Sequence, residues 1–203
     1  MGVERRSTRR QLMARGLAAA GAGAAAGLAV VVDPAVADEA PVTDAQALSK
    51  ALEVERLMVL AYRRVLTSGA LAPDIERAVA PYLTHELQHT SAVAAALAAM
   101  GVRVSTQPLD VDAARDMLSK HNIPVSLTDL HSQNDAMRLL VDLESVAEGV
   151  YFTALKTLST MHLQRLAAQI MACEAQHWTA VSGLRNPGQY VKAVPWPFVT
   201  GSS

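Results

Sequence analysis

The sequence predicts an all-α domain, a four-helix bundle made of two helical hairpins that are joined by a long crossover. Three observations favour this fold class. Apolar residues recur every three or four positions in four long segments, proline and glycine separate these segments, and no alternating pattern of useful strand length occurs. A chain of 203 residues that is 51% apolar also has the size of one ordinary domain.

The first predicted hairpin occupies residues 43 to about 100. Its first helix spans residues 43 to about 68 and carries one stripe at spacings of three and four, formed by Leu48, Leu52, Glu55, Val59, Tyr62 and Leu66. Its second helix opens at Pro73, and Gly101 is a suitable stop at its C-terminal end. Pro81 lies inside this second helix and removes one backbone donor.

The second predicted hairpin consists of helices at about residues 132–158 and 159–184. Residues 101–130 form the connection between the hairpins, with one short turn of helix near residues 112–119. The tail, residues 186–203, is expected to be non-helical and to pack across the bundle, because it is rich in proline: Pro187, Pro195 and Pro197.

The amino terminus has the three-part layout of a secretory signal. Five arginines lie within residues 1–16, residues 17–32 contain only Ala, Gly, Leu and Val, and a small-x-small site ends at Ala37. Arg9-Arg10 is followed by a polar and then a hydrophobic residue, which resembles the twin-arginine (Tat) signature. We therefore expect a Tat-type signal at residues 1–37 that is cleaved after Ala37, and a bundle at residues 38–185.

Composition limits the functions of the remaining chain. Removal of residues 1–37 leaves 13 basic and 17 acidic residues, a net charge of about −4, so a nucleic-acid partner is not expected. Cys173 is the one cysteine, which excludes an internal disulfide. The apolar run of the signal is short and rich in Ala and Gly, so no stable membrane span is expected after cleavage. The expected location is periplasmic or extracellular, with the Tat export machinery as a partner.

A duplicated motif is the strongest signal in the chain. The second predicted helix contains Glu86-Leu87-Gln88-His89-Thr90-Ser91-Ala92-Val93, and the fourth contains Glu174-Ala175-Gln176-His177-Trp178-Thr179-Ala180-Val181. Both segments read E-x-Q-H-x-[S/T]-A-V. Upstream of them, Glu55 precedes Tyr62 by seven residues, and Glu144 precedes Tyr151 by seven. The offsets between counterparts are 88 or 89 residues, so one hairpin resembles a duplicate of the other.

The register of each hairpin brings these residues to one height. Glu55 lies about 12 residues before its turn and Glu86 about 12 residues into the next helix, and the second hairpin repeats this with about 14 residues on each side. Positions i and i+3 share a helix face, so each Glu projects with its His. Four carboxylates and two imidazoles therefore converge if the hairpins pack face to face. Two divalent cations would balance the four buried negative charges. The alternative is a hydrogen-bonded carboxylate network without metal.

This residue set resembles the ferritin-like superfamily over about residues 43–184, since one Glu alternates with one Glu-x-x-His along the four helices. The resemblance implies six metal ligands, in which Glu86 and Glu144, or their symmetry mates, supply bridging or terminal carboxylates: Glu55, Glu86, His89, Glu144, Glu174 and His177. Among its subgroups the chain is most similar to exported bacterial ferritin-like domain proteins. It lacks the Cys-rich iron module of rubrerythrins, which excludes electron delivery through such a module.

The ligand types and the resemblance together imply two Fe ions, with Mn as the alternative, and redox chemistry with O2 or peroxide as the small-molecule partner. The chain is then a di-iron or di-manganese oxidoreductase; the alternative is a non-catalytic metal-binding or stress-related structural protein. Iron storage in a cage would require a closed oligomer, which nothing in the sequence indicates.

The sequence allows two possible roles for several residues near the six predicted ligands. Tyr62 and Tyr151 are either core residues with a tethered hydroxyl or partners of the ligands. Gln88 and Gln176 are either donors to the ligands or surface residues, and Glu148 is either an extra ligand or a partly exposed carboxylate. The remaining histidines have no counterpart in the repeat and are expected at the surface or at helix caps: His85, His121, His131 and His162.

Overall fold

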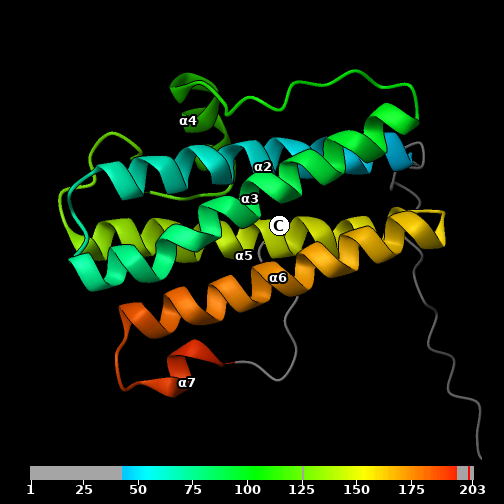
Figure 1. The fold of residues 1–203 in the computed structure, drawn as a ribbon. Coiled ribbons are helices and arrows are strands. Elements are labelled where there is room, and N and C mark those ends of the chain that lie inside the picture. The colour runs from blue at the N-terminus through cyan, green and yellow to red at the C-terminus, as the bar shows by residue number, and fades with distance from the viewer. Residues whose placement is uncertain (1–42, 125, 196–200, 202–203) are drawn as a thin grey trace, which may run out of the picture. The chain divides into compact units, whose positions relative to one another are not determined.

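The structure is a computed structural model that describes residues 43–124, 126–195 and 201. All regular structure among these residues is helical, which confirms the predicted class (Figure 1). The predicted signal, residues 1–37, and Pro197 of the tail lie outside the described residues. The helices are α2 (Asp44–Thr67), α3 (Pro73–Ala99), α4 (Val111–Lys120), α5 (Gln133–Thr157), α6 (Met161–Arg185) and α7 (Tyr190–Ala193).

Side-chain caps fix the starts of three of the long helices. Thr43 begins α2 with a capping box, in which its hydroxyl accepts from the backbone N–H of Gln46 and the Gln46 side chain accepts from the backbone of Thr43. Ser132 caps α5 and Thr160 caps α6 in the simpler way. These polar residues directly precede the periodic segments, so the sequence places the helix ends within one or two residues.

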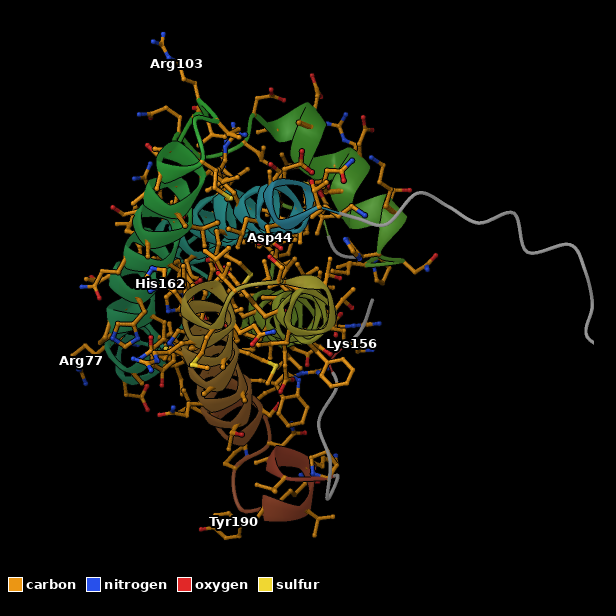
Figure 2. All side chains as sticks on the ribbon, turned by 90° about the vertical axis from the view of Figure 1, so that its right-hand side faces the viewer. Asp44, Arg77, Arg103, Lys156, His162 and Tyr190 are labelled. Atoms are coloured by element: carbon orange, nitrogen blue, oxygen red, sulfur yellow. The ribbon has the colours of Figure 1, made fainter. Side chains whose placement is uncertain are left out.

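The two hairpins are α2–α3 and α5–α6, and they join mainly through α2 and α5 (Figure 1). α3 and α6 touch each other much more sparsely. Figure 2 looks along the helices and shows Asp44, at the start of α2, and Lys156, near the end of α5, at the same end of the bundle. There the Asp44 carboxylate accepts from the backbone N–H of Ser159 at 2.8 Å and from its hydroxyl at 2.7 Å. These bonds hold α2 beside the α5–α6 turn.

Buried apolar side chains form two clusters that lie on either side of the buried glutamates. One contains Leu57 and Met58 of α2 with Leu140 of α5, and the other contains Leu48 and Leu52 of α2 with Leu163 of α6. Burying a side chain of this size contributes about 1.5–3 kcal/mol. The apolar clusters therefore offset the cost of holding polar groups in the middle of the bundle.

Described parts of the crossover and of the tail pack against the long helices. α4 extends the short helix predicted near residues 112–119, and its buried Ala114 and Leu118 join the core. The prediction of a wholly non-helical tail is wrong for Tyr190–Ala193, which form one helical turn beside α6, before the proline at position 195. Further on, a Cβ at Gly201 would lie 2.1 Å from the backbone nitrogen of Gly149, so Gly201 lies against α5.

Among the described residues, no helix combines the length and the apolar character that crossing a bilayer requires.

Candidate metal centre

The structure brings together all six side chains that the duplicated motif singled out. α2 supplies Glu55, α3 supplies Glu86 and His89, and the second hairpin supplies their counterparts, Glu144 of α5 and Glu174 with His177 of α6. The four glutamates are 0% exposed and His177 is 2% exposed. The side chain of His89 is 12% exposed, so it is the member of the set nearest to solvent. We call this set the carboxylate centre.

The carboxylate centre divides into two groups of donor atoms that share two residues. One group holds Glu55 and His89, the other holds Glu144 and His177, and Glu86 and Glu174 belong to both. Within each group the donor atoms all lie within 4.8 Å of one another. The two residues common to both groups are therefore the glutamates of the Glu-x-x-His motifs, and Glu144 lies in one group only.

Each histidine approaches the glutamate of the opposite hairpin more closely than its own. Nδ1 of His89 lies 2.8 Å from Oε1 of Glu174 but 3.7 Å from Oε2 of Glu86. Nδ1 of His177 lies 3.0 Å from Oε1 of Glu86 and 3.3 Å from Oε2 of Glu174. The histidine of each motif thus lies closest to the glutamate of the other motif, as expected for two copies of one unit that face each other.

The donor atoms are close but are not aligned as hydrogen bonds. Both oxygens of Glu86 and of Glu174, one oxygen each of Glu55 and Glu144, and Nδ1 of both histidines are buried without a partner of hydrogen-bond geometry. Buried polar groups in proteins are nearly always paired. These close groups of buried donor atoms without hydrogen-bond partners form an arrangement that could hold metal ions.

Burial and mutual repulsion dominate the electrostatics in the absence of metal. Desolvation raises the pKa of Glu55 and of Glu144 well above the ordinary value, and the charges of neighbouring glutamates add to this. Burial also acts on Glu174, but contacts with His177 and His89 outweigh it and lower its pKa to about 2. Burial lowers the pKa of His89, yet the adjacent Glu174 and Glu86 raise it to about 11. Burial also lowers the pKa of His177, but Glu144, Glu174 and Glu86 outweigh this effect and raise it. In the absence of metal, protons bound to these glutamates and histidines therefore reduce the repulsion between the buried carboxylates.

Two tyrosines connect the hairpins through the carboxylate centre. The hydroxyl of Tyr151 donates to Oε1 of Glu55 at 2.5 Å, and the hydroxyl of Tyr62 donates to Oε1 of Glu144. Burial raises the pKa of both tyrosines, so each hydroxyl keeps the proton that it donates. Both interpretations of the two tyrosines therefore hold. Each ring is a core residue that is 0% exposed, and each hydroxyl donates a hydrogen bond to one predicted ligand. The other oxygen of each carboxylate is left facing the centre.

Replacing Tyr62 by Phe is expected to lower the free energy of unfolding of the metal-free protein by about 1–3 kcal/mol, because Glu144 loses the donor to a buried oxygen. Denaturant titration measures the change. Tyr190→Phe is the matched control, since Tyr190 is 83% exposed on α7 and should leave stability unchanged. Equal stability of the Tyr62 variant and the control would contradict the role assigned to the hydroxyl.

The structure also shows the environments of the other residues near the motifs for which the sequence allowed two interpretations. Glu148 is 3% exposed, so the expectation of a partly exposed carboxylate is wrong, and it belongs to neither group of donors. Desolvation and the nearby Glu174 raise its pKa. Gln88 and Gln176 are exposed, and the Gln176 amide donates to the backbone carbonyl of Ala172 in its own helix. His121 caps the end of α4, as expected.

The sequence reasoning missed three residues that surround His177. Nδ1 of His85 lies 2.9 Å from Nε2 of His177, so His85 is not a simple surface or capping residue. Sγ of Cys173 lies 3.5 Å from the same nitrogen, and the ring of Tyr82 stacks on His177 at 4.4 Å. The repeat contained a signal for two of them, because the offset of 88 residues makes His85 and Cys173 counterparts, each directly before a Glu-x-x-His motif.

Comparison with known proteins identifies the family of the chain. No curated protein and no solved structure gives a significant match to the chain. The family model for the ferritin-like domain matches residues 43–187, which include all four long helices and every residue of the carboxylate centre. The chain therefore belongs to the ferritin-like domain family.

Proposed function

We propose that this chain is an exported ferritin-like protein that binds two Fe or Mn ions in the carboxylate centre and performs redox chemistry with O2 or peroxide. The observation that carries the proposal is the pair of donor groups that share Glu86 and Glu174. Two groups with shared carboxylates match two neighbouring ions, whereas a single ion needs only one of them.

The donors fit such ions in type and spacing. Carboxylate and imidazole ligands suit Fe and Mn, and the carboxylate centre contains no thiolate. Oxygen and nitrogen ligands lie about 2.0–2.2 Å from ions of this size, so ligand atoms at right angles are about 3 Å apart. The distances of 2.8–3.7 Å from the two Nδ1 atoms to the carboxylate oxygens agree with this spacing.

The surrounding residues prepare the carboxylate centre in three ways. Tyr151 and Tyr62 orient Glu55 and Glu144, so that one oxygen of each remains available. The apolar clusters on both sides exclude water, which strengthens electrostatic interactions. The side chain of His89 is 12% exposed and is the member of the centre nearest to solvent, so the proposal has a small oxidant approach from the side of His89. When bound, the two ions would supply electrons to O2 or peroxide.

The test compares Glu86→Gln with Glu53→Gln. Glu86 belongs to both donor groups, whereas Glu53 is an exposed glutamate of α2 and serves as the matched control. The purified protein and the Glu53 variant should carry two Fe or Mn ions per chain and reduce peroxide to water with added Fe²⁺ as the electron donor, and the Glu86 variant should do neither. Two bound ions without any turnover would instead indicate the non-catalytic metal-binding protein. No bound metal in the unmodified chain would contradict both functions.

Export is part of the proposal because it would allow the chain to bind its metal before it leaves the cytoplasm. Tat substrates cross the membrane folded, so a twin-arginine signal at Arg9-Arg10 would let the chain acquire Fe or Mn before export. Outside the cytoplasm, Cu and Zn would otherwise compete with greater affinity. Protein recovered from the periplasm should therefore contain Fe or Mn. Full occupancy by Zn in that protein would contradict loading before export.

A further inference from the structure

A second cluster of metal-binding side chains lies directly outside the carboxylate centre. It consists of His85 of α3 with Cys173 and His177 of α6, and one donor atom from each lies within 4.8 Å of the others. His177 is 2% exposed, whereas His85 and Cys173 are half-buried, so this cluster extends from the core toward the surface. We call it the outer site.

His177 belongs to both places because its ring has two nitrogens. Nδ1 faces the carboxylate centre, 3.0 Å from Oε1 of Glu86. Nε2 is on the other side of the ring and faces His85 at 2.9 Å and Cys173 at 3.5 Å. The ring of Tyr82 stacks on that of His177 and holds its plane. The outer site can therefore use Nε2 without any residue of the first hairpin's Glu-x-x-His motif.

The donor set differs in chemistry from that of the carboxylate centre. A thiolate and two imidazoles are ligands preferred by Zn²⁺ and Cu⁺, whereas four carboxylates favour Fe and Mn. We propose that the outer site binds one thiophilic cation, Zn²⁺ or Cu⁺, through Nδ1 of His85, Sγ of Cys173 and Nε2 of His177.

Two of the three distances between the donor atoms of the outer site are close to those found around such an ion. Imidazole nitrogen lies about 2.0 Å and thiolate sulfur about 2.3 Å from zinc, so neighbouring corners of a tetrahedron are about 3.3 Å apart for two nitrogens and about 3.5 Å apart for nitrogen and sulfur. The distance between Sγ and Nε2 already has this value. The two histidine nitrogens share a hydrogen bond without the cation, and they would separate by about 0.4 Å when the cation replaces the shared proton. The fourth corner would be taken by water.

Cys173 is the one cysteine of the chain, so thiol chemistry reports on the outer site alone. The experiment measures the rate at which iodoacetamide alkylates Cys173 in the purified full chain, with Zn²⁺ or Cu⁺ added at one equivalent above the metal that the carboxylate centre retains. We expect either cation to slow alkylation at least about tenfold, because a metal-bound thiolate is no longer a free nucleophile. The cation that protects at the lower concentration identifies the ion.

His85→Gln should abolish the protection, and His131→Gln, at an exposed histidine away from the outer site, should retain it. A second readout is the thiolate-to-metal absorption band that Co²⁺ produces, which requires Cys173 and should vanish in Cys173→Ser. Absence of both protection and the Co²⁺ band in the unmodified chain would overturn the proposal. Equal protection in His85→Gln would overturn it as well, since it would show that the cation binds without His85.

The outer site does not depend on the proposed redox function. Iron content and peroxide consumption test the carboxylate centre, and neither His85 nor Cys173 belongs to that centre. The Cys173 readout can therefore fail while the iron content remains two per chain, or succeed in a chain that holds no iron.

Discussion

Replacing Glu174 by Gln is expected to remove both metal ions from the carboxylate centre, whereas Glu55→Gln should remove one. Glu174 offers oxygens to both donor groups, and Glu55 belongs to one group only. Loss of a partner that merely orients a ligand lowers metal affinity about 10–100-fold, so loss of a shared ligand should cost at least that at each position. Metal analysis of the two purified variants measures the difference. Equal loss in both would contradict the assignment of Glu174 to a shared position.

The same two variants should also differ in stability when no metal is present, and Glu174→Gln should lower the free energy of unfolding much more than Glu55→Gln does. The pKa of Glu174 is lowered to about 2 by His177 and His89, against the effect of burial, so this residue is charged and paired. Removing one partner of a buried ion pair costs about 3–5 kcal/mol. Desolvation and the charge of Glu174 raise the pKa of Glu55 well above its ordinary value, which favours the neutral carboxyl group, and Gln is a close replacement for that form. Denaturant titration of metal-free Glu55→Gln should show a loss below about 1 kcal/mol.

The second large effect is a stability of the metal-free protein that falls as pH rises above about 4.5. Desolvation raises the pKa of Glu55 and Glu144, so their contribution is fully present below the unfolded value of 4.5 and is lost as pH rises toward the folded value. The carboxylates next to His89 raise its pKa to about 11 against the effect of burial. Its contribution is therefore present below the unfolded value of 6.5 and falls by about 1.4 kcal/mol per pH unit above it.

Glu174 sets the acid limit of the same curve. Since the contacts with His177 and His89 lower its pKa to about 2, its contribution is present above the unfolded value of 4.5 and is lost as pH falls toward 2. The free energy of unfolding of the metal-free protein should therefore be greatest near pH 4.5, because Glu174 loses its contribution below that pH, and Glu55 and Glu144 lose theirs above it. Between pH 6.5 and 8, His89 alone should account for a loss of about 2 kcal/mol.

Metal should reverse this trend, because it binds the deprotonated ligands. Metal stabilises the folded chain by about 2.7 kcal/mol for each site when its concentration is 100-fold above Kd, and the apparent affinity rises with pH. The melting temperatures with and without Fe²⁺ under anaerobic conditions should thus diverge from pH 5 to pH 8. Parallel curves over this range would show that the carboxylates and imidazoles of the centre are not the ligands.

The fold was largely predictable because local and periodic signals agree. Thr43, Ser132 and Thr160 precede the helices that they cap, and Gly101 follows the end of α3 with a φ of 79°. The repeat identified all six residues of the carboxylate centre, since a shared helix face and a shared height depend only on sequence spacing. The helical turn Tyr190–Ala193 was not predicted, because four residues are too few to show a period.

Features that depend on contacts between helices could not be predicted. Spacing does not reveal which carboxylates are shared, since that depends on how closely α3 approaches α6 across the centre. It also does not show that Tyr62 and Tyr151 bind the glutamates of the opposite hairpin. His85 was placed at the surface because it has no histidine counterpart, although its counterpart in the repeat is Cys173 and both reach His177.

The central claim is that two ions occupy positions between the same six side chains, and anomalous diffraction at the iron edge from crystals grown with Fe²⁺ tests it most directly. We predict two peaks, each about 2.0–2.3 Å from its ligand atoms, with Glu86 and Glu174 touching both, Glu55 and His89 touching one, and Glu144 and His177 touching the other. No anomalous peak among these residues, or iron bound only elsewhere on the chain, would contradict the claim.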